Sequence, residues 1–352
     1  MNLGNMKFLL RFQIRQMLRE IRSAFAVVIG MFICLLILMM SIDCAVLCIN
    51  FGNACLKETK YAYMYTYKYP TEDVPAGGTP AYVENLKKEA YGYNLDVTVL
   101  GIDDDNPYFP IETADKKNEI VISSAAAQKF GVKVGDKLVL SDEVNEREYA
   151  FTVKNIVNFT SGVYVFLDRD VMQELFDQED DYYNVVFADH ALDIDNGRLY
   201  ATVSKENVEE SSQIFTDMMG PMVVMLVAIS ALIFMIVMYL MMKVMIDRSA
   251  FSISLMKVFG YRRREIRRLY LDGNFYVILL GALICVPLAK WSMDLVYPYC
   301  IANVAIGMDL KFTPQIYIMI YGGIWLCYIV INFLLVGRLN KLVPAEVLKN
   351  RE

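Results

Sequence analysis

The 352-residue sequence is poor in the residues from which most catalytic and metal sites are built. It contains a single histidine, His190, so a histidine-based triad or a multi-histidine metal site would have to be assembled around that one side chain. None of the seven cysteines lies between residues 57 and 217, and no Cys-x-x-Cys pair occurs, which argues against a disulfide framework and against structural zinc. No Gly-x-x-x-x-Gly-Lys-Ser/Thr phosphate loop is present, so the chain does not hydrolyse ATP by that route.

Charge is missing from four long segments. The chain is 56% hydrophobic and 21% charged, and runs of 19, 23, 17 and 26 residues without Asp, Glu, Lys or Arg occupy 24–42, 220–242, 273–289 and 312–337. About 20 apolar residues in a helix cross the hydrocarbon core, and lipid cannot satisfy open backbone groups. The first run is too long for a cleaved signal peptide. We therefore expect four retained membrane helices, at 24–51, 220–246, 273–299 and 312–337.

The charges are divided unequally between the connecting segments. Residues 52–219 carry 15 basic and 31 acidic side chains, whereas 1–23, 247–272 and 338–352 each carry an excess of Lys and Arg. Lys and Arg near membrane helices remain on the cytoplasmic side. Both termini and 247–272 are therefore expected on the cytoplasmic side of the cell membrane, and 52–219 and 300–311 on the external side. The acidic outer segment argues against nucleic acid as a partner. Residues 1–23 read either as an amphipathic helix in the inner lipid interface or as a plain basic flank.

The outer segment 52–219 is predicted to fold as a mixed α+β domain. Every second residue of Tyr61–Tyr69 is tyrosine, so a strand would place these rings on one face, against neighbouring strands or against a ligand. Gly131 is expected to end a helix, Asp168 to begin one, and Lys205 to start a helical stalk into the second membrane helix. The other expected elements are strands at 96–102, 119–122, 137–140, 149–157, 163–167, 183–187 and 198–203, and helices at 81–91, 124–130 and 171–176.

Charged residues near the ends of the apolar runs are predicted to reach water. Asp43 lies nineteen residues after Ala24, about 28 Å along a helix, which places it close to the outer interface. Lys290 and Asp294 are expected to extend to the same interface from the third helix. The acidic residues at 103–105 and 193–195 lack the ligand spacing of a calcium loop, so we expect turns there.

The cytoplasmic segment 247–272 contains a short amphipathic pattern. Ile253, Met256 and Phe259 recur at intervals of three, Gly260 can break or bend the chain, and three arginines follow at 262–264. The pattern predicts a short helix. Such a helix could rest on the lipid surface as a basic flank, or it could insert apolar residues into a groove on a soluble partner.

The layout of one helix, a large outer domain and three further helices resembles the FtsX-like, MacB-type permeases of ABC transporters. Residues 253–266 are similar to that family's loop between helices two and three, "Ile-Gly-x-Leu-Arg/Lys-Ala-Leu-Gly-Ala", with Lys257 and Gly260 matching. Residues 119–140 resemble the core of the family's periplasmic domain, and 342–349 resemble its "Pro-x-Glu-Ala-Leu-Lys" ending. The chain departs from the loop pattern at Ser252, Ser254 and Tyr261.

The resemblance implies a four-helix bacterial membrane protein of MacB-like, type VII permease architecture, with no catalytic activity of its own. A separate cytoplasmic ATP-binding subunit would hold ATP and Mg²⁺, and a second permease, identical or related, would complete the transporter. By this analogy, seven residues would contact the ATP-binding subunit: Ile253, Met256, Lys257, Phe259, Gly260, Arg262 and Arg263.

The implied activity is the coupling of ATP hydrolysis to movement of the outer domain. That movement would export or remove a peptide, an antibiotic such as an antimicrobial peptide, or a lipid-linked substrate. The alternative is an FtsX-like membrane regulator of a cell-envelope enzyme, or a peptide-sensing receptor.

Overall fold

The computed structural model describes residues 21–69, 73–114, 116–248, 250–261, 263–307 and 309–341. Residues 1–20, Arg262 and the tail motif at 342–349 therefore lie outside the described residues. The chain divides into two compact units. One comprises the chain up to Asp43, 223–295 and the part after 310, and the other comprises 44–222 and 296–310.

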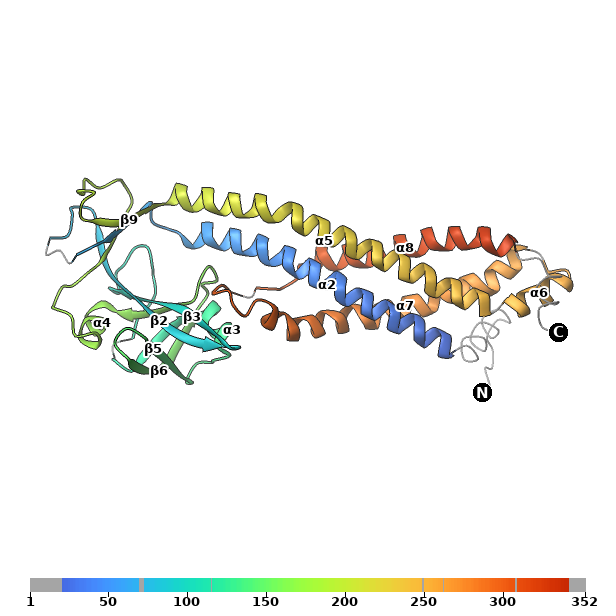
Figure 1. The fold of residues 1–352 in the computed structure, drawn as a ribbon, viewed down its shortest axis with the longest axis horizontal. Helices are drawn as coiled ribbons and strands as arrows, with labels where there is room; N and C mark the ends of the chain where they lie inside the picture. The colour runs from blue at the N-terminus through green and yellow to red at the C-terminus, as the bar shows by residue number, and fades with distance from the viewer. Residues whose placement is uncertain are drawn as a thin grey trace. The chain divides into compact units, whose positions relative to one another are not determined.

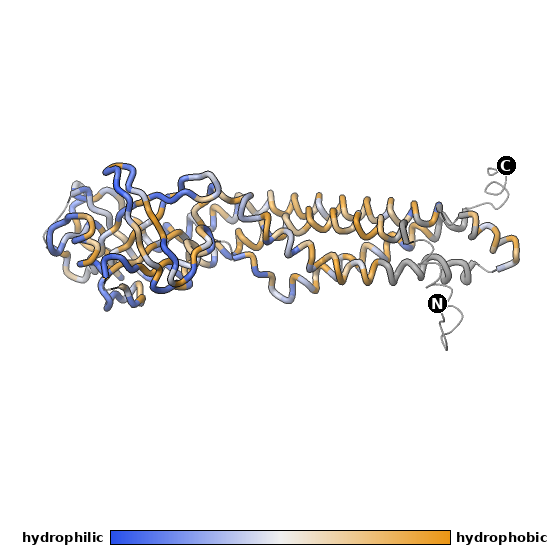
Figure 2. The backbone as a smooth tube through the Cα atoms, turned by 90° about the horizontal axis from the view of Figure 1, so that it is seen from below, coloured by the Kyte–Doolittle hydropathy of each residue, from blue (hydrophilic) through white to orange (hydrophobic). Residues whose placement is uncertain are grey.

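Four long helices carry the apolar runs. Each contains a segment long and apolar enough to cross a membrane, at Phe25–Glu58, Lys205–Val244, Ile278–Cys300 and Pro314–Leu335, and Figure 2 shows their hydrophobic character. The four predicted membrane helices are thereby confirmed, and α5 begins at Lys205, where the stalk was expected. The helices are α2 (Ile21–Glu58), α5 (Lys205–Arg248), α7 (Arg263–Cys300) and α8 (Pro314–Lys341).

The domain between α2 and α5 is built on a sheet that closes on itself (Figure 1). The neighbours β3, β7, β4, β6, β5 and β2 follow one another, and β2 pairs with β3 again. The barrel closes where Lys87 of β2 pairs with Ser141 of β5. Strands β8, β1 and β9 continue outward from β2. The strands are β1 (Tyr63–Tyr67), β2 (Thr79–Ala90), β3 (Tyr93–Ile102), β4 (Glu119–Ser123), β5 (Lys137–Asp142), β6 (Arg147–Val157), β7 (Tyr164–Asp168), β8 (Val185–Ala188) and β9 (Leu199–Ser204).

Alternation along the barrel strands separates two cores. In β4, Ile120 and Ile122 belong to one buried cluster, together with residues such as Val97 and Val165, whereas Val121 between them belongs to a second cluster with Phe166. Successive side chains of a strand point to opposite faces, so both faces of these strands are buried. The predicted α+β fold is confirmed, and it has two apolar layers.

The two short helices are present with the predicted capping residues, although α4 begins two residues earlier and ends one residue earlier than predicted. In α3 (Ser124–Phe130), Ser123 accepts a hydrogen bond from the Ala126 amide, and Gly131 follows in the left-handed conformation at φ 65°. In α4 (Arg169–Leu175), the Asp168 side chain accepts from two amides of the first turn. These local caps satisfy backbone groups that a helix end leaves open.

The helix predicted at 81–91 is wrong. These residues lie in β2, which pairs with β3 from Tyr82↔Gly101 to Ala90↔Tyr93. The buried residues Tyr82, Leu86 and Ala90 recur every four positions. A spacing of four places side chains on one face in both a helix and a strand. Pairing with a distant strand, rather than local periodicity, decides between the two.

The tyrosine-rich segment forms a strand over Tyr63–Tyr67, as predicted, and two of its rings are buried, whereas Tyr69 beyond the strand is exposed. Strand β1 lies between β8 and β9, and Tyr65 and Tyr67 are buried there. The Tyr67 ring packs edge-on against Tyr183, and the Tyr65 hydroxyl accepts a hydrogen bond from the Leu192 amide. Contacts with the segments on either side of β8 therefore engage these two tyrosines.

The segment that follows α7 is attached to the α+β domain. The buried Lys129 ammonium donates to the Ile301 carbonyl at 2.6 Å, and the Gly307 amide donates to the Thr160 carbonyl at 3.0 Å. A Cβ on Gly307 would lie 2.7 Å from that same oxygen, so a side chain there would displace the contact. Burial lowers the pKa of Lys129 from 10.5 to about 8.

The lowered pKa of Lys129 predicts that the folded protein becomes more stable as the pH rises. Above about pH 8 the folded protein holds Lys129 neutral, whereas the unfolded chain keeps this proton until its ordinary pKa of 10.5. The free energy of unfolding should therefore increase with pH in this window, by up to about 1.4 kcal/mol per pH unit. Thermal unfolding of the full chain in detergent between about pH 7.5 and about pH 9.5 measures this. Lys129→Met should flatten the profile, and an unchanged profile in that variant would contradict the assignment.

Candidate coupling site

The short helix predicted within 247–272 is present as α6 (Ala250–Val258). It ends in a defined turn, because Gly260 has φ 81° and the Tyr261 amide donates to the Met256 carbonyl at 3.2 Å. A positive φ at the residue beyond the helix, with a bond spanning five residues, is the Schellman arrangement. Gly260 therefore separates α6 from α7, which begins at Arg263.

The structure distributes the predicted contact residues over different faces. Ile253 is buried, Met256 is half-buried and Phe259 is 72% exposed. The side chains of Lys257 and Arg263 and the whole of Arg262 lie outside what the structure describes. Of the seven residues, Phe259 and Gly260 are therefore the two that are described as exposed.

Sequence reasoning missed three exposed apolar side chains at the end of α6. Leu255, Val258 and Tyr261 are 40%, 60% and 48% exposed. A spacing of three falls about 60° short of a full helical turn, so Ile253 and Phe259 point about 120° apart. The rule that i+3 and i+4 neighbours share a face would have placed Leu255, Val258 and Phe259 together. Together with Tyr261, these residues form an apolar surface that we call the α6 tip.

Helix α2 makes polar and close contacts with its neighbours in the helical unit. The Ser41 and Ser230 hydroxyls of α2 and α5 are 2.7 Å apart. A Cβ on Gly281 of α7 would come within 2.5 Å of the Met31 side chain. Small residues allow such approach between membrane helices, where packing and hydrogen bonds take the place of the hydrophobic effect.

A buried group of charges joins α2 to α7. The Lys290 ammonium lies 2.7 Å from an Asp43 carboxylate oxygen and also contacts Asp294, one turn further along α7. It lies 4.1 Å from the centre of the Phe312 ring. The Asp43 side chain is wholly buried, and that of Lys290 is 8% exposed. The prediction that Asp43 and Lys290 reach water is therefore wrong, because they form an ion pair across 247 residues of sequence, whereas Asp294 does reach solvent as predicted.

Each charge of the buried Asp43–Lys290 ion pair is stable only while the other is present. A charge removed from water loses several kcal/mol of solvation, which an opposite charge at hydrogen-bond distance offsets. The second Asp43 oxygen, Oδ2, has no hydrogen-bond partner among the described residues. Asp43 consequently depends on Lys290, whereas Asp294 is about half exposed and retains access to solvent.

We expect single substitutions in this pair to be more harmful than the double substitution. Lys290→Met should destabilise the protein by about 3–5 kcal/mol, because it leaves the Asp43 carboxylate buried without a partner. Asp43→Leu combined with Lys290→Met removes both charges and should recover most of the loss. The measurement is thermal unfolding in detergent, with Asp294→Asn as the exposed control. Equal destabilisation by the single and double variants would show that the ion pair has no such role.

Comparison with known proteins supports the resemblance of the helical part to FtsX-like permeases. Residues 224–344 match the family model described as FtsX-like permease C-terminal. No curated protein matches the sequence.

One solved structure similar to this chain is the extracellular domain of the noncanonic ABC-type transporter YknZ from Gram-positive bacteria. It shares 13% identity, and the match covers 46% of this chain and 95% of that one, at a TM-score of 0.24.

The matched segment begins within α5, contains α6 and α7, and extends past the described end of α8. It includes the α6 tip, Gly260 and Lys290. Over residues 224–344 the chain is therefore similar to the C-terminal part of FtsX-like permeases.

Proposed function

We propose that the chain is the permease subunit of an ABC transporter and that the α6 tip is where a separate cytoplasmic ATP-binding subunit docks. The nucleotide cycle of that subunit moves the helices, and the helices transmit the movement to the α+β domain. The observation that carries this proposal is an exposed apolar surface at a helix end that is held in place by the Gly260 turn.

The apolar composition of the α6 tip fits a contact with another protein. Phe259 and Val258 expose most of their side chains, with Leu255 beside them. Apolar residues grouped in this way at the end of a helix are suited to a groove on a partner, where a few buried anchors supply most of the binding energy. The basic residues at 262–264 would lie at the edge of that contact.

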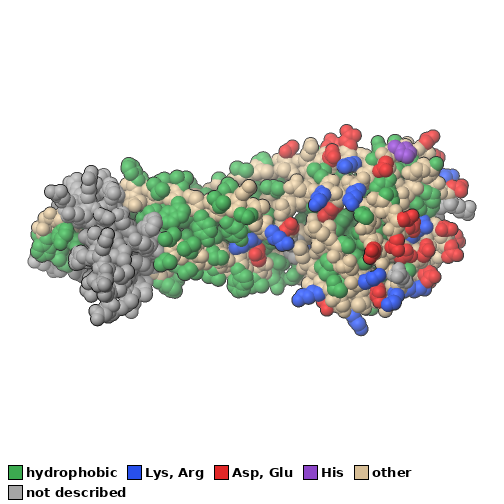
Figure 3. All heavy atoms as spheres, turned by 180° about the vertical axis from the view of Figure 1, so that it is seen from behind, with side chains coloured by type: hydrophobic (Ala, Val, Ile, Leu, Met, Phe, Trp, Pro, Cys, Tyr) green, Lys and Arg blue, Asp and Glu red, His purple; other side chains and the backbone are tan. Residues whose placement is uncertain are grey.

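The distribution of charge supports the orientation. Lys and Arg predominate in 247–272 and at both ends of the chain, whereas 52–219 is acidic. Figure 3 shows carboxylates over much of the viewed surface of the α+β domain and apolar side chains along the helices. We infer that both termini and α6 are cytoplasmic and that the domain is external.

The complete transporter contains a second permease, either another copy or a related chain, and two ATP-binding subunits. The work done is mechanical, and its object is a peptide, an antibiotic or a lipid-linked molecule. Stimulation of the partner's ATPase by such a substrate supports this function. Binding of an external hydrolase without export supports the alternative role as a regulator of an envelope enzyme.

Truncating Phe259 should weaken association with the ATP-binding subunit. Burying a phenylalanine contributes about 2 kcal/mol, which corresponds to about thirtyfold in affinity. Because Phe259 is 72% exposed in this chain, Phe259→Ser should leave thermal unfolding unchanged. Co-purification from the native membrane, quantified by mass spectrometry, measures the association. Val144→Ser, at a 91% exposed position of the α+β domain, is the control, and equal recovery with both variants would refute docking at the α6 tip.

The Gly260 turn allows a second, graded test. A Cβ at this position would meet no atom within 4 Å, so the cost of a substitution comes from the positive φ alone. Asparagine tolerates this conformation, alanine loses about 1 kcal/mol or more, and proline cannot adopt it. Recovery of the ATP-binding subunit should therefore fall in the order Gly, Asn, Ala, Pro. A loss with Asn as large as that with Pro would argue against a role for the turn geometry. Arg263→Glu tests the predicted basic edge separately.

A further inference from the structure

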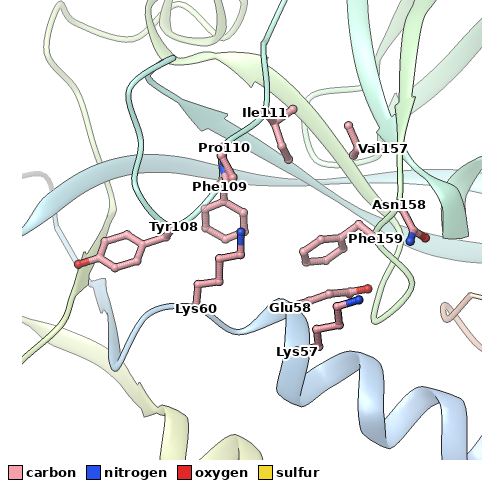
Figure 4. A pocket seen from close by; sticks show the side chains of 10 residues that line it. All are labelled: Lys57, Glu58, Lys60, Tyr108, Phe109, Pro110, Ile111, Val157, Asn158 and Phe159. Atoms are coloured by element: carbon pink, nitrogen blue, oxygen red, sulfur yellow. The ribbon is translucent and has the colours of Figure 1, made fainter.

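A pocket of about 280 Å³ lies in the α+β domain beside the end of α2. Its walls come from three places in the sequence: the end of α2, the loop after β3, and the end of β6 with the residues that follow it (Figure 4). The volume is at the small end of the about 300–1,000 Å³ that is usual for ligand sites. The pocket is therefore suited to one chemical group of a ligand rather than to a large molecule as a whole. The lining residues are Lys57, Glu58, Lys60, Tyr108, Phe109, Pro110, Ile111, Val157, Asn158 and Phe159.

The floor of the pocket is apolar and fixed. The Phe109 and Phe159 rings are 6.4 Å apart, and both pack against Phe166 of the second buried cluster. The Asn106 side chain accepts hydrogen bonds from the amides of Tyr108 and Phe109, which sets the course of the loop. A rigid aromatic wall of this kind binds an alkyl or aryl group at little entropic cost, because the wall is already ordered.

The one carboxylate in the lining is already engaged. The two Glu58 oxygens accept hydrogen bonds from the Thr160 amide at 2.7 Å, the Thr160 hydroxyl at 3.1 Å and the Ser161 amide at 2.8 Å. These bonds stabilise the ionised carboxylate and direct it to the backbone of the loop. Glu58 therefore fastens the end of α2 to the loop after β6, and among the described residues the hydrogen bonds of its carboxylate go to that loop rather than to either lysine of the lining.

Two exposed lysines border this apolar floor. Lys57 lies on the last turn of α2, and Lys60 extends from the following segment towards Phe109 (Figure 4). Among the described residues, no ion pair involves either of them, whereas several other lysines of the domain, such as Lys87, Lys116 and Lys117, pair with carboxylates. The lining therefore holds two lysines without an ion pair among the described residues, in a segment with twice as many acidic as basic side chains.

We infer that this pocket binds an amphiphilic anion. The alkyl or aryl part of the ligand lies against Phe109 and Phe159, and its phosphate or carboxylate group accepts hydrogen bonds from Lys57 and Lys60. Three donors on each ammonium suit a multivalent oxyanion. A cation would also be attracted by the rings, but the two lysines disfavour it. The inference deepens the proposed function by naming a ligand class for the outer domain, and it does not require docking at the α6 tip.

Photolabelling of the full chain in lipid nanodiscs tests the site directly. The probe is an alkyl phosphate with a diazirine at the end of its chain, and peptide mass spectrometry locates the adducts. We expect adducts within 108–111 and 157–159. Octyl phosphate should compete, whereas inorganic phosphate, which has the same head without the chain, and octyltrimethylammonium, which has the chain with the opposite charge, should not.

Three double variants test whether labelling depends on the positive charges of Lys57 and Lys60 or only on the fold of the domain. Lys57→Gln with Lys60→Gln should lower labelling by about tenfold or more, because both charge-assisted contacts are lost. Lys57→Arg with Lys60→Arg should retain it. Lys133→Gln with Lys137→Gln makes the same change of charge at exposed positions outside the pocket and should also retain it. Equal labelling of the two Gln pairs, adducts confined to other segments, or better competition by the ammonium compound would each overturn the inference. None of these outcomes bears on the co-purification tests, so the two proposals fail independently.

Discussion

The absence of water from a bilayer is the constraint on which the helical part of this protein depends. Backbone groups there must bond within the helix, and any buried charge must find an opposite charge within the protein. Lys290 meets this requirement with Asp43 and Asp294, next to the Phe312 ring. The pair links α2 to α7, and the hydroxyl contact between Ser41 and Ser230 links α2 to α5. Helix α2 is thereby held by specific polar contacts with two neighbouring helices, in addition to its close packing.

A second buried lysine shows the other way in which this chain accommodates a cation. Lys129 contacts a backbone carbonyl rather than a carboxylate, and burial lowers its pKa to about 8. Its acceptor, Ile301, belongs to the segment that follows α7. The α+β domain is therefore attached to the rest of the chain by α2, by α5 and by this segment. On the proposed function, a movement of α7 and α8 would reach the domain by a route separate from that of α2 and α5.

The α+β domain combines an acidic surface with an aromatic interior, and the proposed ligand site lies where these meet. Tyr61 illustrates how apolar the interior is: its ring packs against Phe109 and Phe187, and burial raises its pKa to about 12. The acidic residues at 103–105 form a turn as predicted, in which Asp104 accepts hydrogen bonds from Thr113 and Asp103 pairs with Arg169. These contacts position the loop that carries Tyr108 and Phe109. Charged and aromatic residues that look unrelated in sequence thus build one wall of the pocket.

The sequence by itself determined every feature that depends on neighbouring residues. The four apolar helices, the Gly131 and Asp168 helix ends, the β1 tyrosines and the stop at Gly260 follow from hydropathy, backbone preference and local hydrogen bonds. The tertiary structure alone decided the features that depend on distant partners: β2 as a strand, the barrel closure between Lys87 and Ser141, the burial of Asp43 by Lys290, and the aromatic pocket. A spacing of four residues suits helix and strand equally, and a lone charge near a membrane end does not reveal its counter-ion. Only pairing across long stretches of chain resolves both, because the free energy that selects the outcome lies in contacts between residues far apart in sequence.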